Sequence, residues 1–343
     1  MPVTLSVDVM SGDHGLSVTV PAALSCLQED PDLQIVLVGD QPQIEAELRK
    51  QKAGPDSRRS IRHTTETVAM DESPSKVLRS KKDSSMRVAI DLVHEGQAQA
   101  MVSAGNTGAL MATAKFVLKT LPGIDRPAIV SAIPSVNGYV HMLDLGANAE
   151  CTSEQLFQFA VMGSALITAM QGNAHPKVAL LNIGSEEIKG NDIIRGAATM
   201  LQASSLNYIG FIEGDGIFLS EVDLVVCDGF VGNVALKTGE GVAKMIRQFL
   251  KEEFSASILH KMAAVAAMPA LKALSKRIDP RYYNGATLLG LNGTVVKSHG
   301  SADVVGFANA IRVGIREVKE NVPHRISALL GEALKTSVDV RAA

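Results

Sequence analysis

The sequence predicts an α/β protein built on a largely parallel sheet that helices cover on both faces. Short apolar runs alternate with helical patterns, as where residues 33–40 are followed by residues 41–50. Such alternation implies crossover connections between parallel strands. The runs VALLNIG (178–184) and VDLVVCDG (222–229) are almost continuously apolar, which is typical of strands buried on both faces. At 343 residues, the chain is long enough for one large α/β unit or two lobes.

The alternation assigns elements in order from the N-terminus to about residue 230. We expect strands, some ending in a turn, at 3–10, 33–40, 98–106, 127–135, 139–148, 176–184 and 222–230. We expect helices at 21–30, 41–50, 107–119, 153–172 and 193–204.

Two segments depart from this pattern. Residues 51–86 are polar and rich in Ser, Lys and Arg. We expect a solvated excursion there, or else a lid or a partner-facing loop. Residues 255–280 are helical in pattern and rich in Ala and Met, and Pro269 is expected to kink them or split them into two helices.

Composition and missing motifs exclude several classes of protein. A net charge of −3 argues against a broad nucleic-acid surface. Three cysteines are a poor disulfide framework and show no metal-ligand spacing, so a reducing cytosol is the expected location. We see no signal peptide and no apolar run of the roughly 20 residues that span a bilayer. The chain also lacks the zinc pattern H-E-x-x-H, the serine-hydrolase elbow and both glycine-rich nucleotide fingerprints.

Glycine-containing polar turns follow five of the expected strands, at 11–15, 103–108, 144–148, 184–190 and 228–233. Ligands of open α/β sheets bind outside the carboxyl ends of strands. Glycine permits a sharp turn and a close approach to a ligand, and the amides at the next helix start favour an anion. Each turn alone is ordinary turn chemistry, but five of them together indicate a ligand site.

The residue types in these turns indicate an anion bound beside a carbonyl group. Lys189, in a glycine-bounded loop, suits an anion, although a solvated lysine is the simpler alternative. Asn106, Asn148 and Asn233 can donate to a developing oxyanion, or can serve as helix caps. Asp13 and His14 can orient or ionise a ligand, or can be structural. Together these groups indicate phosphate beside a thioester or similar carbonyl, and hence acyl transfer.

Eight motifs then occur in order over about 300 residues: DVMSGDHG, SAGNTGA, LDLGAN, NIGSEEIKGN, FIEGDGIF, CDGFVGNVALK, GATLLGLNG and KSHGSADVVGFANAI. In this the chain resembles the bacterial phosphate acyltransferases of phospholipid synthesis, which move a long acyl chain from acyl carrier protein to inorganic phosphate. One departure is Ser11, where the family usually has glycine, so that turn is expected to differ in shape.

The resemblance implies a three-layer α/β/α sandwich with a mixed, mostly parallel sheet, similar to isocitrate and isopropylmalate dehydrogenases, plus a helical hairpin extension. Residues 1–335 would form one unit of two interwoven lobes, with the extension at 251–280 acting as a dimer contact, a membrane tip or both. It also implies a homodimer, no nucleic-acid partner, and a cytoplasmic protein attached peripherally to the anionic inner face of the cell membrane. A membrane glycerol-3-phosphate acyltransferase would receive the product.

The resemblance also completes the predicted site, for which no metal and no cofactor are expected. We predict as catalytic residues Lys189, Asn233, His14 and Asn148. We predict as substrate-binding residues Asp13, Ser103, Asn106, Thr107, Asp144, Gly184, Glu187, Asp228, Gly229, Phe230, Gly232, Lys237, Ser298 and His299.

For the mechanism, phosphate is already an anionic nucleophile and needs positioning more than activation. Lys189 would hold it, Asn233 or Asn148 would stabilise the oxyanion, and His14 would either protonate the departing thiolate or hold phosphate. Three alternatives stay open. They are a phosphate acetyltransferase-like enzyme with an acyl-coenzyme A donor, a metal-dependent dehydrogenase of the same fold, and a non-catalytic membrane or scaffold protein. The basic segments 79–87 and 275–283 are candidate docking sites for the acidic carrier protein.

Overall fold

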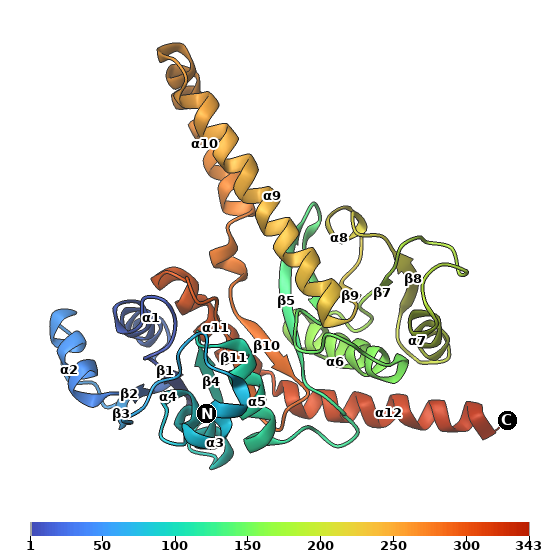
Figure 1. Cartoon of the computed structure of the whole chain (residues 1–343), viewed down its shortest axis with the longest axis horizontal. Coiled ribbons are helices and arrows are strands. Elements are labelled where there is room, and N and C mark those ends of the chain that lie inside the picture. The colour runs from blue at the N-terminus through green and yellow to red at the C-terminus, as the bar shows by residue number, and fades with distance from the viewer. Residues whose placement is uncertain (1, 343) are drawn as a thin grey trace.

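An eleven-stranded sheet organises the chain in a computed structural model, which describes the backbone of residues 2–342 and the side chains of residues 2–332 (Figure 1). The strand order is β3-β2-β1-β4-β11-β10-β5-β6-β9-β7-β8. In chain order the strands are β1 (Val3–Asp8), β2 (Leu33–Gly39), β3 (Arg59–His63), β4 (Ala100–Ser103), β5 (Ala128–Ser135), β6 (Gly138–Leu143), β7 (Val178–Leu181), β8 (Tyr208–Ile212), β9 (Leu224–Val226), β10 (Ala286–Leu289) and β11 (Thr294–Lys297).

The sheet is mixed but mostly parallel, as predicted. Strands β3, β2, β1, β4 and β11 run parallel to one another, and β6, β9, β7 and β8 form a second parallel set. The β5–β6 hairpin and β10 join the sets through antiparallel pairs, β10 with β11, β10 with β5, and β5 with β6. Following these pairs across the sheet, the second set runs opposite to the first.

Helices cover both faces of this sheet and complete the predicted three-layer sandwich. They are α1 (Leu16–Glu29), α2 (Gln41–Lys50), α3 (Pro74–Ser80), α4 (Ser85–His94), α5 (Thr107–Leu118), α6 (Ser153–Gln171), α7 (Asp192–Gln202), α8 (Gly216–Leu219), α9 (Gly229–Ser255), α10 (Ile258–Arg277), α11 (Val304–Lys319) and α12 (Val322–Ala342), with a 3-10 turn η1 (Pro280–Tyr283).

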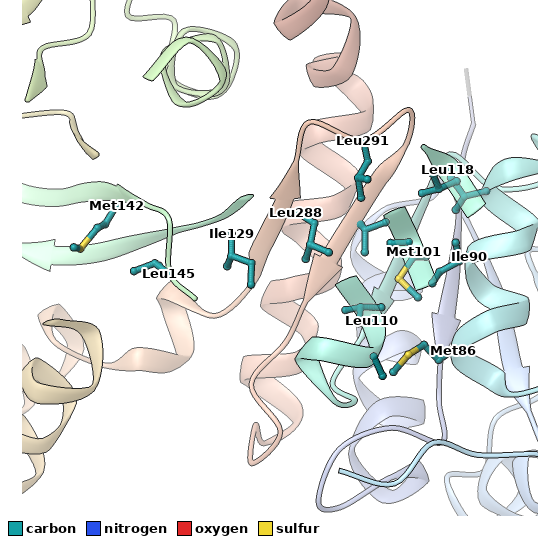
Figure 2. Close-up of a cluster of buried hydrophobic side chains, with 14 of the residues drawn as sticks. Met86, Ile90, Met101, Leu110, Leu118, Ile129, Met142, Leu145, Leu288 and Leu291 are labelled. Carbon is teal, nitrogen blue, oxygen red and sulfur yellow. The ribbon is translucent and has the colours of Figure 1, made fainter. Parts of the chain in front are cut away.

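Alternating side chains of the strands supply three apolar cores. Ile129 of β5 points into a core with α4 and α5, whereas its neighbours Ala128 and Val130 point into a core with α6, α7 and α12. A third core joins β1 and β2 to α1 and α11. The first core extends along one face of the sheet, and Figure 2 shows it from Met86 of α4 to Met142 of β6. Period-two alternation along buried strands therefore explains the layers.

Helices α9 and α10 form a hairpin that projects away from the sandwich (Figure 1). The chain reverses at residues 255–257, where Ser257 caps α10 by accepting a hydrogen bond from the amide of His260. Of the two outcomes expected at Pro269, a kink or a split into two helices, the split is wrong. Helix α10 runs unbroken through Pro269, and the break falls instead at the Ser255–Ser257 turn.

The expected strands and helices up to residue 230 are confirmed, with ends that shift by a few residues. Residues 51–86 are not a simple excursion. They contain the edge strand β3, helix α3 and the start of α4. Only alternate residues of β3 are half-buried, and an edge strand of this kind carries a weak apolar signal.

Candidate active site at two groups of strand ends

The five predicted ligand turns, and a sixth after β11, fall into two groups. The turns after β1, β4 and β11 follow strands of one direction, and those after β6, β7 and β9 follow strands of the other. In the second group β9 lies between β6 and β7, so its three turns are neighbours on one edge. The sequence could not reveal this division, because strand direction depends on pairing across the sheet.

Asp144 is the centre of the second group and is fully buried. Its carboxylate accepts hydrogen bonds from the backbone amides of Ile129 at 2.9 Å, Ala147 at 3.1 Å and Asn148 at 2.7 Å. Burial raises the pKa of Asp144, and these hydrogen bonds oppose the rise. Its carboxylate therefore shapes the turn from inside, which corrects the prediction that it contacts substrate.

The prediction of Asn148 as an oxyanion donor is also corrected. Its side-chain nitrogen donates to the carbonyl of Pro127 and to the carboxylate of Asp144, both at 2.9 Å. An asparagine amide has two N–H bonds, so none is left for a substrate. Asn148 is a buried positioning residue of the β6 turn.

The start of α9 packs directly on this turn. Asp228 caps the helix by accepting a hydrogen bond from the amide of Val231 at 2.8 Å. A Cβ atom on Gly229 would lie 2.6 Å from the carbonyl oxygen of Asn148, and one on Gly232 would lie 1.9 Å from that of Asp144. Both glycines are thus required for backbone contact, as well as for any approach to a ligand.

Asn233 and Phe230 are both exposed at this helix start. Asn233 lies against Gly146, since a Cβ atom added to Gly146 would be 3.4 Å from the Cβ of Asn233. Within the described part of the chain its amide makes no hydrogen bond, so its donors are available. Of the two asparagines, Asn233 is therefore the one with amide hydrogens available to a ligand.

Lys189 lies in the neighbouring turn, after β7. Its side chain passes over Gly184. A Cβ atom added to Gly184 would lie 2.8 Å from the Cγ of Lys189 and 2.7 Å from the carboxylate of Glu186. Lys189 and Glu187 are exposed, and no ion pair of Lys189 occurs among the described side chains. Asn182, at the base of the loop, is buried, and its side-chain nitrogen has no partner in that part of the chain. The loop thus has one exposed cation and, beneath it, a buried unpartnered amide nitrogen that sequence reasoning missed.

The first group begins with the turn after β4, where most polar atoms are already bonded. Buried Ser103 donates to the carboxylate of Asp8 at 2.7 Å and accepts from the amide of Gly105. Asn106 caps α5 through the amide of Ala109 and donates to the carbonyls of Met70 and Glu72. Of the predicted ligands here, Thr107 is the exposed one.

A backbone hydrogen bond joins the turns after β1 and β11. The amide of Asp13 donates to the carbonyl of Gly300 at 2.9 Å. Ser298 is buried and accepts a hydrogen bond from Asn284, whereas Asp13, His14 and His299 are exposed.

Ser11, the departure from the family pattern, has a structural explanation. Its hydroxyl donates to the carbonyl of Asp8 at 2.7 Å and accepts from the amide of Ala104 at 2.9 Å. Ser11 therefore ties the turn after β1 to the turn after β4.

Lys297, which sequence reasoning missed, ends β11 beneath these turns and is only 9% exposed. Its ammonium donates to the carbonyl of Ala104 at 3.3 Å and to the carbonyl of Ser298, and forms no ion pair within the described residues. Burial lowers the pKa of Lys297 to about 8, with Lys237 adding to the fall and Asp13 and Asp8 opposing it. A lysine at the end of the apolar run TVVK, before a glycine turn, is the signal that could have found it.

Lys237 of α9 connects the two groups. It is exposed, pairs with Glu240 at 3.0 Å, and lies one turn beyond Asn233. Burial lowers the pKa of His299, and the charge of Lys237 is the next contribution to that fall. Because Lys237 acts on both Lys297 and His299, α9 carries positive charge from the second group of turns toward the first.

Among the described residues, no three His, Cys, Asp or Glu side chains gather as metal ligands would. Cys227 is buried, and burial raises the pKa of its thiol well above the usual value.

Among the helices of the described residues, none has the length and apolar character that a membrane span needs.

Known proteins resemble this chain in both fold and sequence. A phosphotransacetylase from Streptococcus pyogenes aligns with a TM-score of 0.63 and 18% identity, over 93% of this chain and 94% of that one. The EutD phosphotransacetylase from Staphylococcus aureus aligns with a TM-score of 0.59 and 16% identity, over 92% and 94%. At these identities the likeness concerns the fold alone.

Sequence relatives are much closer. The family model described as fatty acid synthesis protein matches residues 3–325. A phosphate acyltransferase of Methylococcus capsulatus is 58% identical over 323 residues, covering 94% of this chain and 95% of that protein. One of Halorhodospira halophila is 57% identical over 333 residues, covering 97% of each. With such identity along nearly its whole length, the chain belongs to the phosphate acyltransferase family.

Proposed function

We propose that this chain transfers a long acyl chain from the thioester of acyl carrier protein to inorganic phosphate. The product, an acyl phosphate, would be the first intermediate toward phosphatidic acid in phospholipid synthesis. Family membership supports phosphate and an acyl donor as substrates.

One structural observation carries the proposal. Neighbouring turns after β7 and β9 present the ammonium of Lys189 and the amide of Asn233, both exposed and both without a hydrogen-bond or ion-pair partner among the described side chains. A cation suits phosphate, and a neutral donor suits the oxyanion of an attacked thioester. Both groups stand at the same edge of the sheet, as attack on a bound thioester requires.

The proposed reaction is direct attack. An oxygen of hydrogen phosphate attacks the thioester carbonyl carbon, and the carbonyl electrons move to oxygen, where Asn233 donates. Collapse of this intermediate breaks the C–S bond. The proton of the phosphate passes to the departing thiolate, so acyl phosphate and the free thiol of the carrier balance the step. His14, exposed after β1, is the candidate carrier of that proton.

The deciding assay uses purified protein, palmitoyl-acyl carrier protein and phosphate, with acyl phosphate trapped by hydroxylamine. Hydroxamate above the no-enzyme control is the expected result, without added Mg²⁺ or NAD. Activity with palmitoyl-coenzyme A but not with the carrier-bound thioester would favour the alternative, a phosphate acetyltransferase-like enzyme. No hydroxamate from either donor would exclude the proposed activity.

We further propose a homodimer that uses the apolar side of α9. Val242, Met245, Ile246, Phe249 and Leu250 are all exposed on this helix. Contiguous exposed apolar side chains of this kind usually mark an interface. Phe249→Glu should convert the dimer to a monomer in light scattering, whereas the exposed-site control Gln248→Glu should stay dimeric.

A peripheral membrane contact is proposed for the tip of the hairpin. Ile258 and Leu259 are 79% and 75% exposed there, and Met262 and Val265 follow on α10. An apolar tip that enters the lipid interface would let a hydrophobic acyl phosphate pass to a membrane glycerol-3-phosphate acyltransferase. This would place the protein in the cytoplasm, at the anionic inner face of the membrane.

The membrane proposal predicts that Leu259→Glu with Met262→Glu abolishes sedimentation with anionic liposomes. The matched pair Leu271→Glu and Leu274→Glu, near the other end of α10, should retain it. Equal sedimentation of the tip variant and the wild type would exclude the tip as the lipid contact.

A further inference from the structure

One side of α9 carries the candidate oxyanion donor and a row of cations. Relative to Asn233, spacings of 4, 11, 14 and 18 residues return to nearly the same side of a helix with 3.6 residues per turn. These positions hold Lys237, Lys244, Arg247 and Lys251, which we name the α9 basic stripe. The stripe leads away from Asn233 for about 27 Å, at 1.5 Å per residue. The apolar residues of α9, including Val242, Ile246 and Phe249, lie on the other side.

The stripe keeps most of its charge. All four of its side chains are exposed. Lys237 pairs with Glu240, but Lys244, Arg247 and Lys251 form no ion pair with the side chains that the structure describes.

The two basic segments that the sequence suggested are partly neutralised by their own neighbours. In 79–87, Lys81 pairs with Glu72, and Arg87 pairs with Asp91. In 275–283, Arg281 pairs with Asp279 and with Asp303. Paired cations attract an acidic partner less, and only the α9 stripe leads along one helix to Asn233, so α9 is the better docking candidate.

The stripe lies on the side of α9 nearest the turn after β11 and the end of α10. After burial, the charge of Lys237 is the main contribution that lowers the pKa of His299, and Lys244 contributes as well. Arg247 is near enough to Asp279, at the base of α10, to help lower the pKa of that carboxyl, after its hydrogen bond to Arg281. These effects place the stripe beside the turn after β11 and the end of α10.

We propose that the α9 basic stripe is the docking surface for the acidic acyl carrier protein. This inference rests on the proposed function, and it gives the carrier a site that ends at Asn233. Complementary charge steers an acidic partner onto the stripe and fixes its orientation. A carrier bound along the stripe delivers its thioester at the stripe's inner end, where Asn233 and Lys189 are.

A lipid surface fits this side of α9 less well. Helices that lie on membranes bury an apolar side, with basic residues at its borders or above it. Here the stripe lies opposite the apolar side, and its inner end lies near His299 of the turn after β11.

The test uses the full-length protein with Lys244→Glu and Lys251→Glu combined, which leaves Lys237 intact. The dissociation constant for fluorescently labelled holo-acyl carrier protein, measured by anisotropy, should rise at least about tenfold. KM for palmitoyl-acyl carrier protein should rise similarly, with kcat and the KM for phosphate unchanged. The rise of the wild-type dissociation constant with added salt should be weaker in the variant.

The matched control is Arg79→Glu with Lys82→Glu, which makes the same change of net charge on an exposed basic segment. It should bind the carrier like wild type. Equal carrier affinity of the α9 variant and the wild type would overturn the proposal, as would a loss confined to the control pair. If the α9 variant keeps carrier binding but no longer sediments with anionic liposomes, the stripe is a lipid contact instead. Carrier binding is measured without turnover, so failure of the proposed reaction is seen separately, as absent hydroxamate.

Discussion

The side-chain amide of Asn148 donates a hydrogen bond of 2.9 Å to the carboxylate of Asp144, and both residues are buried. This pair holds the turn after β6 in the shape on which α9 begins, since Gly229 and Gly232 contact the backbone of the same two residues. Two residues that look like ligands in the sequence therefore build the floor of the site.

Asn148→Ala should mainly destabilise the protein. It removes two hydrogen bonds and leaves the carbonyl of Pro127 buried without this donor, at a cost of about 2–4 kcal/mol in the free energy of unfolding. Urea denaturation measures this cost. A variant with wild-type stability and a specific loss of kcat would return Asn148 to the catalytic residues.

Asn233→Ala should have the opposite profile. Its amide is exposed and its substitution breaks no hydrogen bond of the described residues, so the folded protein should be as stable as wild type. Loss of an oxyanion donor should lower kcat by about 10²-fold. Steady-state kinetics decide, because a rise in KM alone would assign Asn233 to substrate binding.

Lys189→Ala should weaken phosphate binding without affecting stability. The lysine is exposed, and its lost charge-assisted contact should cost about 1.5–3 kcal/mol of phosphate affinity. KM for phosphate measures the effect, and Lys177→Ala, an exposed lysine that pairs with Glu221, is the control. Unchanged phosphate KM and kcat in Lys189→Ala would remove it from the site.

Lys297 should give the reaction an alkaline limit. Its pKa is lowered to about 8, chiefly by burial, so the ammonium loses its proton as the pH rises through 8. If that charge helps to hold phosphate, kcat/KM for phosphate should fall over the same range. Lys297→Arg, which stays protonated, should move the fall to higher pH. A wild-type profile that is flat from pH 7 to pH 9.5 would exclude this role.

Glu317 should make stability depend on pH away from the site. Burial raises its pKa from 4.5 to about 7, against the opposing effects of the Thr287 hydrogen bond and Arg316. The folded state then holds a proton that the unfolded state releases between these values. The contribution of Glu317 to the free energy of unfolding is fully present below pH 4.5 and is lost as the pH rises to about 7.

Glu317→Gln should therefore stabilise the protein at pH 8 by on the order of 3 kcal/mol, and by little near pH 4.5. Thermal unfolding of both proteins at the two pH values measures this. An equal difference in stability between the variant and the wild type at both pH values would show that the carboxyl of Glu317 does not titrate in this range.

Local pattern was enough for the fold class and for most elements up to residue 230. Buried strands such as β7 and β9 are continuous apolar runs, and helix starts such as Asn106 and Asp228 carry side chains that cap. The edge strand β3 was not predicted, and the split that was one of the two outcomes expected at Pro269 does not occur. An edge strand has few buried residues, and a helix that is exposed on most sides can accommodate a proline in its interior.

The sequence by itself determined the fold class, the family resemblance and the turns that hold the candidate site, because apolar periodicity, glycine turns and motif order are local properties of the chain. The tertiary structure alone decided which turns are neighbours, since strand direction separates the β1, β4 and β11 ends from the β6, β7 and β9 ends. It also decided which polar side chains are free. Asn148 and Asn233 are alike in the sequence, but the partners Pro127 and Asp144 occupy the first and leave the second exposed. Hydrogen bonds between residues distant in the chain form only when the sheet brings them together, and this is the physical reason that one asparagine is structural and the other is available to a substrate.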